Sequence, residues 1–241
     1  MTYCVGLLLN EGFVLLSDTR TNAGLDNIAT YRKMFLFEDP GERVIAILTA
    51  GSLSVTQTTI ARLKEAIEDP DATERTSIMK APTLLKVAEL VGNTLSAVRR
   101  DIDEKLASMN QGASASMIVA GQRRDGAMRM FLIYPEGNFI EATEDTPFLQ
   151  IGEHKYGKPI LDRVVKPTTS LVDAQKVALL SMDSTLRSNL SVGMPLDMCV
   201  INRDEFRIGT LRRIEAGDEA FREMSEAWSR ALRDGFTQIT I

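Results

Sequence analysis

Histidine and cysteine are almost missing from this sequence, which contains one His and two Cys among 241 residues. The single histidine, His154, excludes a Ser-His-Asp triad unless it belongs to the triad itself, and no GxSxG nucleophile elbow is present. Cys4 and Cys199 lie far apart and outside any CxxC pattern, so we expect two reduced thiols on strands rather than a disulfide framework or zinc site. The sequence predicts no metal and no cofactor.

Long hydrophobic runs are also missing. The longest, such as VGLLL and FVLL, are far too short to cross a bilayer, and no basic segment precedes the first one as in a signal peptide. The net charge of -5 gives the chain nothing that would attract phosphate backbones. We therefore expect a cytoplasmic protein without a membrane or nucleic-acid partner.

The remaining composition is that of an ordinary globular protein. Charged residues make up 25% and hydrophobic residues 44% of the chain. A length of 241 residues is enough for one large domain with a well-buried core, so we expect a single domain over 1–241.

Strand patterns fill the first fifth of the chain. Apolar runs at 3–9 and 13–18 flank Asn10-Glu11-Gly12 and predict a hairpin with a three-residue turn. The segments KMFLF and RVIAILTA predict a second hairpin across Pro40-Gly41. Two helices are expected next, one capped by Ser52 or Ser54 and one over 81–109 opened by Pro82.

The same alternation of strands and helices continues to the end. Strands are expected at 114–121, 128–135, 138–143, 196–202 and 206–214, and helices from about 155, over 173–189 and from 218. Segregated antiparallel strands and helices predict an α+β layered fold, and two sheets between helix layers fit the counts.

The first hairpin places polar groups at one end of the sheet. If Leu9 and Phe13 flank the turn, the numbers of facing residues sum to 22, which puts Asp18 opposite Cys4. Thr2, Cys4, Asp18 and Arg20 then share one face, unless a bulge at Gly12 shifts the register by one.

A meander of four strands would bring four groups to the same edge, namely Thr2, Asp18, Lys33 and Gly51. Gly51 also precedes a predicted helix, where free N–H groups and the helix dipole favour negative charge. Singly, Asp18 could merely end a strand, Lys33 could be a solvated charge and Gly51 could belong to a turn. Together they predict a hydroxyl, a carboxylate, an ammonium and an anion-receptive backbone at one place.

Five segments carry a family resemblance: TYCVG, SDTRTNAG, RKMF, TAGS and, late in the chain, LRSNLSVGMPLDMCVIN. With these motifs the chain resembles the catalytic β-subunits of proteasomes, which are N-terminal nucleophile hydrolases, and among them the bacterial group called Anbu. The resemblance implies a four-layer αββα sandwich and self-assembly of identical subunits into a ring or open helical oligomer. It implies a peptide or unfolded-protein substrate and identifies no ATPase partner.

The resemblance also implies residue roles. Thr2 would be the nucleophile, Asp18 and Lys33 its charged neighbours, and the Gly51 amide the oxyanion donor. Ser191 matches a supporting serine, whereas Ser188 stands where an Asp is usual, and LQIGEHKYG lacks the serine expected in GSGS. The substrate pocket would be lined by Thr21, Tyr31, Thr49 and Leu53.

The chemistry suits an N-terminal threonine. Its α-amine can serve as the base for its own hydroxyl, and a nearby Lys33 ammonium would favour the neutral, basic form of that amine. The mechanism requires removal of Met1, which the small Thr2 side chain would permit.

Other interpretations remain open. The site could hydrolyse small amides, as acylases do, or be silent in a structural subunit. The segment GEHKYGKP nearly matches a phosphate-binding loop, but Pro159 replaces the hydroxyl that should hold magnesium. In the last helix, Phe221, Met224, Trp228, Ala231 and Leu232 form a stripe suited to core packing or, alternatively, to a subunit contact.

Overall fold

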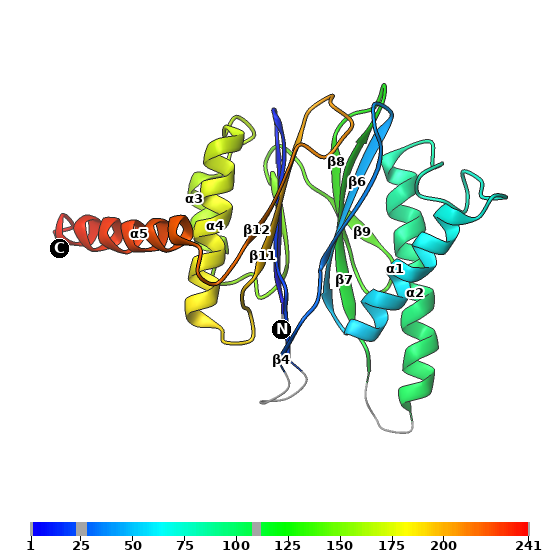
Figure 1. Cartoon of the computed structure of the whole chain (residues 1–241), viewed down its shortest axis with the longest axis horizontal. Helices are drawn as coiled ribbons and strands as arrows, with labels where there is room; N and C mark the ends of the chain where they lie inside the picture. The colour runs from blue at the N-terminus through cyan, green and yellow to red at the C-terminus, as the bar shows by residue number, and fades with distance from the viewer. Residues whose placement is uncertain (1, 23–27, 108–111, 241) are drawn as a thin grey trace.

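The computed structural model describes residues 2–22, 28–107 and 112–240. Two five-stranded antiparallel sheets lie face to face, with α3 and α4 outside one sheet and α1 and α2 outside the other (Figure 1). The expected αββα sandwich of an α+β protein is thus confirmed.

The first sheet, in the strand order β10-β1-β2-β11-β12, joins segments from both ends of the chain. Its strands are β1 (Tyr3–Leu9), β2 (Gly12–Asp18), β10 (Phe148–Gly152), β11 (Leu196–Asn202) and β12 (Thr210–Ile214). Since β1 and β2 lie inside the sheet, both edges of that hairpin are paired, β1 with β10 and β2 with β11.

The second sheet is a simple meander in the order β5-β6-β7-β8-β9. It contains β5 (Met34–Asp39), β6 (Arg43–Gly51), β7 (Ala115–Arg123), β8 (Arg129–Ile133) and β9 (Phe139–Glu141). A small separate hairpin of β3 (Arg20–Asn22) and β4 (Ile28–Thr30) links the two sheets. Its strands have three residues each and a largely polar sequence, so periodicity did not predict them.

The helices are α1 (Leu53–Glu68), α2 (Leu84–Leu106), α3 (Lys158–Val164), α4 (Leu171–Ser188) and α5 (Glu219–Thr237). The second helix begins two residues after Pro82, because the Thr83 side chain caps it by accepting a hydrogen bond from Lys86 N at 3.1 Å. No helix among the described ranges is both long and apolar enough to cross a membrane.

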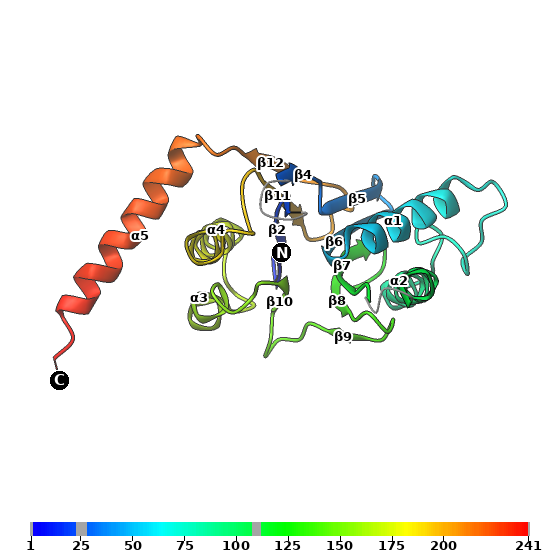
Figure 2. The ribbon, with the colours of Figure 1, turned by 90° about the horizontal axis from the view of Figure 1, so that it is seen from below.

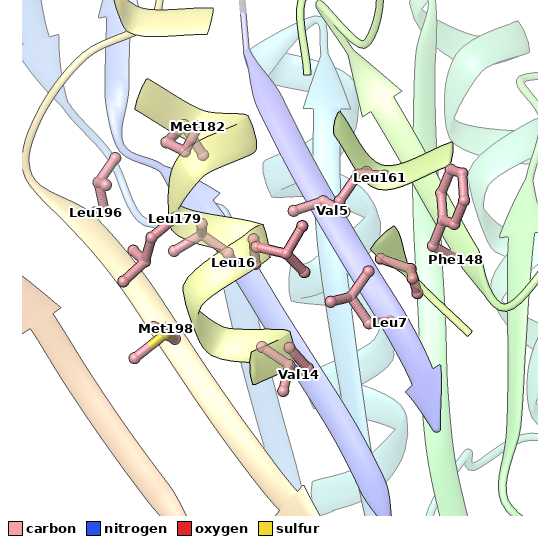
Figure 3. Close-up of a cluster of buried hydrophobic side chains, with 14 of the residues drawn as sticks. Val5, Leu7, Val14, Leu16, Phe148, Leu161, Leu179, Met182, Leu196 and Met198 are labelled. Carbon is pink, nitrogen blue, oxygen red and sulfur yellow. The ribbon is translucent and has the colours of Figure 1, made fainter. Parts of the chain in front are cut away.

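Strand alternation produces the three apolar layers of the core. Alternate residues of β1 and β2, such as Val5, Leu7, Val14 and Leu16, pack with Leu161, Leu179 and Met182 of α3 and α4 (Figure 3). The intervening residues, including Cys4, Phe13 and Leu15, face the second sheet. Each fully buried side chain of this kind contributes about 1.5–3 kcal/mol.

The register predicted for the first hairpin is wrong by one residue. Cys4 pairs with Ser17 rather than Asp18, because Leu9 pairs with Gly12 and the turn contains only Asn10 and Glu11. Gly12 is therefore the first residue of β2, where its backbone lies so close to Ile201 that an added Cβ would be 2.2 Å from the carbonyl oxygen. The prediction that Cys4 and Asp18 share a face is thus also wrong.

The four-strand meander is wrong as well, because the two predicted hairpins belong to different sheets. The β1–β2 hairpin lies in one sheet and the β5–β6 hairpin in the other, with the β3–β4 hairpin between them along the chain. Because the two sheets face each other, the start of β1 in one sheet still lies close to the end of β6 in the other (Figure 2).

The last helix, α5, only partly follows the packing expectation. Phe221 and Met224 pack against the first hydrophobic layer, while Leu232 and Phe236 are 54% and 77% exposed. The helix extends away from α3 and α4 and ends far from both sheets (Figures 1 and 2). Its apolar stripe therefore continues beyond the part that the rest of the chain covers.

Candidate active site

A pocket of roughly 310 Å³ opens where β1 begins and β6 ends. We call it the Thr2 pocket. Its lining residues are Thr2, Thr21, Arg32, Lys33, Thr49, Ala50, Gly51, Ser52, Leu53 and Thr56. The structure thus brings Thr2, Lys33 and Gly51 to one cavity, although they come from three separate segments of the chain.

Thr2 is held by backbone contacts with the segment after β10. The carbonyl oxygen of Thr2 accepts a hydrogen bond from Glu153 N at 2.7 Å, and Thr2 is almost fully buried. Gly152 has a φ of +81°, and a Cβ added to it would lie 1.9 Å from that same oxygen. This close approach explains why a glycine opens the GEHKYGKP segment.

Two other features of the GEHKYGKP segment argue against a phosphate-binding loop. The Lys158 ammonium is paired with the Asp162 carboxylate at 2.5 Å, and α3 has only seven residues.

Within the described parts of the chain, no group of three or more His, Cys, Asp or Glu side chains is placed to hold a metal ion.

Asp18 ends β2 and lies behind the pocket, fully shielded from solvent. Its Oδ1 accepts hydrogen bonds from Lys33 Nζ at 2.8 Å and Tyr3 N at 3.1 Å, and its Oδ2 accepts one from Gly193 N at 3.3 Å. Burial raises the pKa of the Asp18 carboxyl, and the Lys33 ammonium and the two backbone N–H groups oppose that rise.

Lys33 is nearly as deeply buried as its partner. Besides Asp18, its ammonium donates to the Arg20 carbonyl at 2.6 Å. These two bonds use two of its three protons and fix the long side chain between β2 and the start of β5. The main chain of Lys33 is held too, since its carbonyl accepts from Thr49 N at 2.8 Å.

Gly51, the last residue of β6, lies at the other wall, directly before the N-cap residue of α1. It has a φ of +109°, and an added Cβ would be 2.3 Å from the Ser114 carbonyl oxygen, so only glycine fits without displacement. Ser52 is the N-cap residue of α1, yet its side chain makes no capping bond, contrary to the expected role of Ser52 or Ser54. Because Ser52, Leu53 and Thr56 line the pocket, the first turn of α1 and the positive end of its dipole lie at this wall.

The loop after α4 closes the back of the site. Besides the bond from Gly193 to Asp18, Pro195 O accepts from Thr19 Oγ1 at 2.6 Å and Leu190 O accepts from Arg20 at 3.0 Å.

Of the two predicted supporting serines, Ser191 is half-buried in this loop, and its backbone N–H donates to the Asn189 side chain at 2.9 Å. Ser188 instead is exposed, as the last residue of α4.

The predicted substrate-pocket residues divide into two groups. Thr21, Thr49 and Leu53 line the Thr2 pocket. Tyr31 does not, and its side chain is 39% exposed. Its backbone N–H bonds to the Thr19 carbonyl at 2.9 Å, which fixes the chain beyond β4 but leaves the ring outside the cavity.

Sequence reasoning missed four pocket residues, namely Arg32, Ala50, Ser52 and Thr56. Helical spacing could have found Thr56, which follows Leu53 by three residues and Ser52 by four. Arg32 had no comparable signal, because it is an exposed residue outside any strand.

Two titratable groups follow Thr2 on β1 but do not line the pocket. Burial raises the pKa of Tyr3 to about 12, although its hydroxyl bonds to Ser181 and accepts from Gln150. Burial also raises the pKa of the Cys4 thiol, which donates to the Thr49 carbonyl at 3.6 Å. Neither group is ionised near neutral pH.

Comparison with solved structures places this architecture among bacterial proteins called Anbu. A Gly-1 mutant of Anbu from Hyphomicrobium sp. strain MC1 is 48% identical, with a TM-score of 0.92, 100% of this chain covered and 99% of the other. Anbu from Yersinia bercovieri, described as an ancestral beta-subunit, is 41% identical, with a TM-score of 0.91 and coverage of 99% and 98%.

A third similar structure is described as the helical assembly of the Anbu complex from Pseudomonas aeruginosa. It is 44% identical, with a TM-score of 0.93 and coverage of 99% of this chain and 97% of that one. No curated protein matches this chain significantly. The proteasome subunit family model matches residues 2–201. The chain therefore belongs to the proteasome subunit family and to its Anbu group.

Proposed function

We propose that the protein is a threonine peptidase in which Thr2, once it is the first residue, attacks a peptide bond. The observation that carries this proposal is the shared cavity of Thr2, Lys33 and Gly51, with Asp18 buried behind Lys33. A hydroxyl, a cation and the start of a helix at one cavity are the groups that acyl transfer requires.

In the proposed reaction, the free α-amine of Thr2 takes the proton from its own Oγ1 as that oxygen attacks the substrate carbonyl carbon. Lys33 favours the neutral form of the amine, since like charges repel, and Asp18 keeps Lys33 charged and in place. The branched Cβ of Thr2 limits the rotamers of its hydroxyl.

The amide of Gly51 would stabilise the tetrahedral oxyanion, a contribution of about 3 kcal/mol in comparable sites. The carbon–nitrogen bond then breaks, the leaving amine takes the proton, and an ester remains on Thr2. Water, deprotonated by the same α-amine, attacks the ester and releases the acid product. Thr2 and its amine are regenerated.

The experiment is peptide hydrolysis by matched variants. Thr2→Ser keeps a hydroxyl and should retain measurable turnover, whereas Thr2→Ala should abolish it. Both new residues are small enough for Met1 removal, so mass spectrometry can verify the same processing in all three proteins. Equal turnover by wild type and Thr2→Ala would refute the proposal, and no turnover by processed wild type would favour a silent subunit.

Small-amide hydrolysis is separated by substrate length. A peptidase should cleave internal peptide bonds in a panel of long peptides, whereas a small-amide hydrolase should cleave only short acyl amides. Loss of both activities in Thr2→Ala would assign either one to this site.

We also propose that the protein assembles with copies of itself. A structure of 44% identity is described as a helical assembly, and the exposed half of the α5 stripe offers an apolar surface. Leu232→Glu should lower the oligomer mass measured by light scattering, while Arg233→Glu, beside it in sequence, should not. An unchanged mass for Leu232→Glu would exclude α5 from the contact.

A further inference from the structure

Cations and hydroxyl groups dominate the lining of the Thr2 pocket. Arg32 and Lys33 are its charged members, and the hydroxyl-bearing members are Thr2, Thr21, Thr49, Ser52 and Thr56. The ten lining residues include no carboxylate. A basic side chain of a substrate would therefore find no counter-charge there, whereas an acidic one would find cations and hydrogen-bond donors.

The two cations differ in how their charge is balanced. The Lys33 ammonium lies 2.8 Å from the Asp18 carboxylate, so that pair is close to neutral as a unit. Arg32 forms no ion pair or side-chain hydrogen bond within the residues that the structure describes. The Asp197 carboxylate lies close enough to Arg32 for their charges to attract each other, but the ion pair of Asp197 is with Arg213, whose Nε lies 3.8 Å from its Oδ1.

Arg32 is also placed at the mouth of the pocket. It is exposed, and it lines both the Thr2 pocket and an adjoining groove of roughly 420 Å³ formed mainly by β5 and β12. A guanidinium in this position can reach a side chain entering the pocket without being buried itself. The Thr2 pocket, at roughly 310 Å³, lies at the lower end of the range for ligand sites and has room for one substrate side chain.

We propose that Arg32 selects substrates with Asp or Glu at the residue whose carbonyl Thr2 attacks. The inference rests on the proposed peptidase function and names its substrate class. The planar guanidinium can donate two parallel hydrogen bonds to a carboxylate, which gives geometry as well as charge to the recognition.

The test compares fluorogenic peptides that are identical except for Glu, Gln, Leu or Lys before the leaving group. Glu and Gln are nearly equal in shape, so the ratio of their kcat/KM values isolates the charge. We expect a ratio of roughly five for wild type, the upper end for an exposed charge pair. It should fall to about one in Arg32→Gln, drop below one in Arg32→Glu and survive in part in Arg32→Lys.

A matched control keeps the net-charge change the same. Arg75→Gln removes an exposed arginine from the loop between α1 and α2, outside the pocket, and should leave the ratio unchanged. Raising the salt concentration should reduce the wild-type ratio, because screening weakens an exposed pair. Turnover with equal values for Glu and Gln would overturn the inference and leave the peptidase proposal intact.

A binding measurement separates the two proposals if no peptide is turned over. The Thr2→Ala variant is titrated calorimetrically with product peptides that end in Glu or Gln. Tighter binding of the Glu peptide, lost in Thr2→Ala/Arg32→Gln, would support recognition by Arg32 although peptidase function fails. Equal binding, or no binding, would overturn the inference.

Discussion

Replacing Lys33 by Met should reveal how the buried ion pair of the site is stabilised. The change removes the cation 2.8 Å from Asp18 Oδ1 and leaves a carboxylate without solvent exposure. Breaking a buried pair by removing one partner costs about 3–5 kcal/mol, because the remaining charge stays desolvated. We expect the free energy of unfolding to fall by this amount near neutral pH.

The loss should depend on pH with a definite sign. Burial raises the pKa of Asp18 and the Lys33 charge is the largest effect opposing it, so the pKa rises further in Lys33→Met. A carboxyl group with a raised folded-state pKa favours folding below its ordinary pKa of about 3.9, and this contribution is lost as pH rises through the folded-state pKa. The deficit relative to wild type should be small at pH values below the raised Asp18 pKa of the wild-type protein and grow by up to about 1.4 kcal/mol per pH unit above it.

The assay is urea unfolding followed by far-UV circular dichroism from pH 4 to 8, at equal protomer concentration because assembly also shifts stability. The double variant Asp18→Asn/Lys33→Met carries neither charge, so its deficit should be nearly independent of pH and smaller than that of Lys33→Met at pH 7. A pH-independent deficit in Lys33→Met, or a double variant just as unstable at pH 7, would refute the reasoning.

Three other predictions follow from the same geometry. Gly51→Ala should lower the melting temperature and impair turnover, since its Cβ would lie 2.3 Å from Ser114 O at a φ of +109°, whereas Gly217→Ala, with no atom within 4 Å, should melt like wild type. Both buried thiols should resist a thiol reagent at pH 8 until the protein unfolds, and rapid labelling of the native protein would contradict their burial. Because burial raises the Cys199 pKa to about 12, the free energy of unfolding should also fall as pH rises above 9.0 towards that value. Ser191→Ala should reduce kcat more than Ser188→Ala, because Ser188 is exposed at the end of α4; equal effects would count against a supporting role for Ser191.

Much of the fold could be predicted because apolar periodicity is a local property of the sequence. The strands of both main hairpins and the amphipathic α2 and α4 follow from alternation and helical spacing. The register of β1 with β2 could not be predicted, since it depends on whether Gly12 belongs to the turn or the strand. The contact with Ile201, 189 residues away in sequence, places Gly12 in β2.

The site could be predicted only in part, for a similar reason. Strand ends and helix starts identified Thr2, Lys33 and Gly51, and these residues do line one cavity. The bond from Gly193 to Asp18 and the contact of Glu153 with Thr2 join segments more than 150 residues apart, so local patterns gave no sign of them. Tyr31 illustrates the opposite error, since the family resemblance assigned it to the substrate pocket, but its neighbour Arg32 lines the cavity and Tyr31 does not.

The central claim is that Thr2 becomes a reactive N-terminal nucleophile, and covalent labelling tests it most directly. The purified protein, with Met1 removal verified by mass, is treated with a peptide epoxyketone, which requires both the hydroxyl and the free amine of an N-terminal threonine. The account predicts a single adduct, mapped to Thr2 and missing in Thr2→Ala. A processed wild-type chain that gains no adduct, or one whose adduct persists in Thr2→Ala, would contradict it.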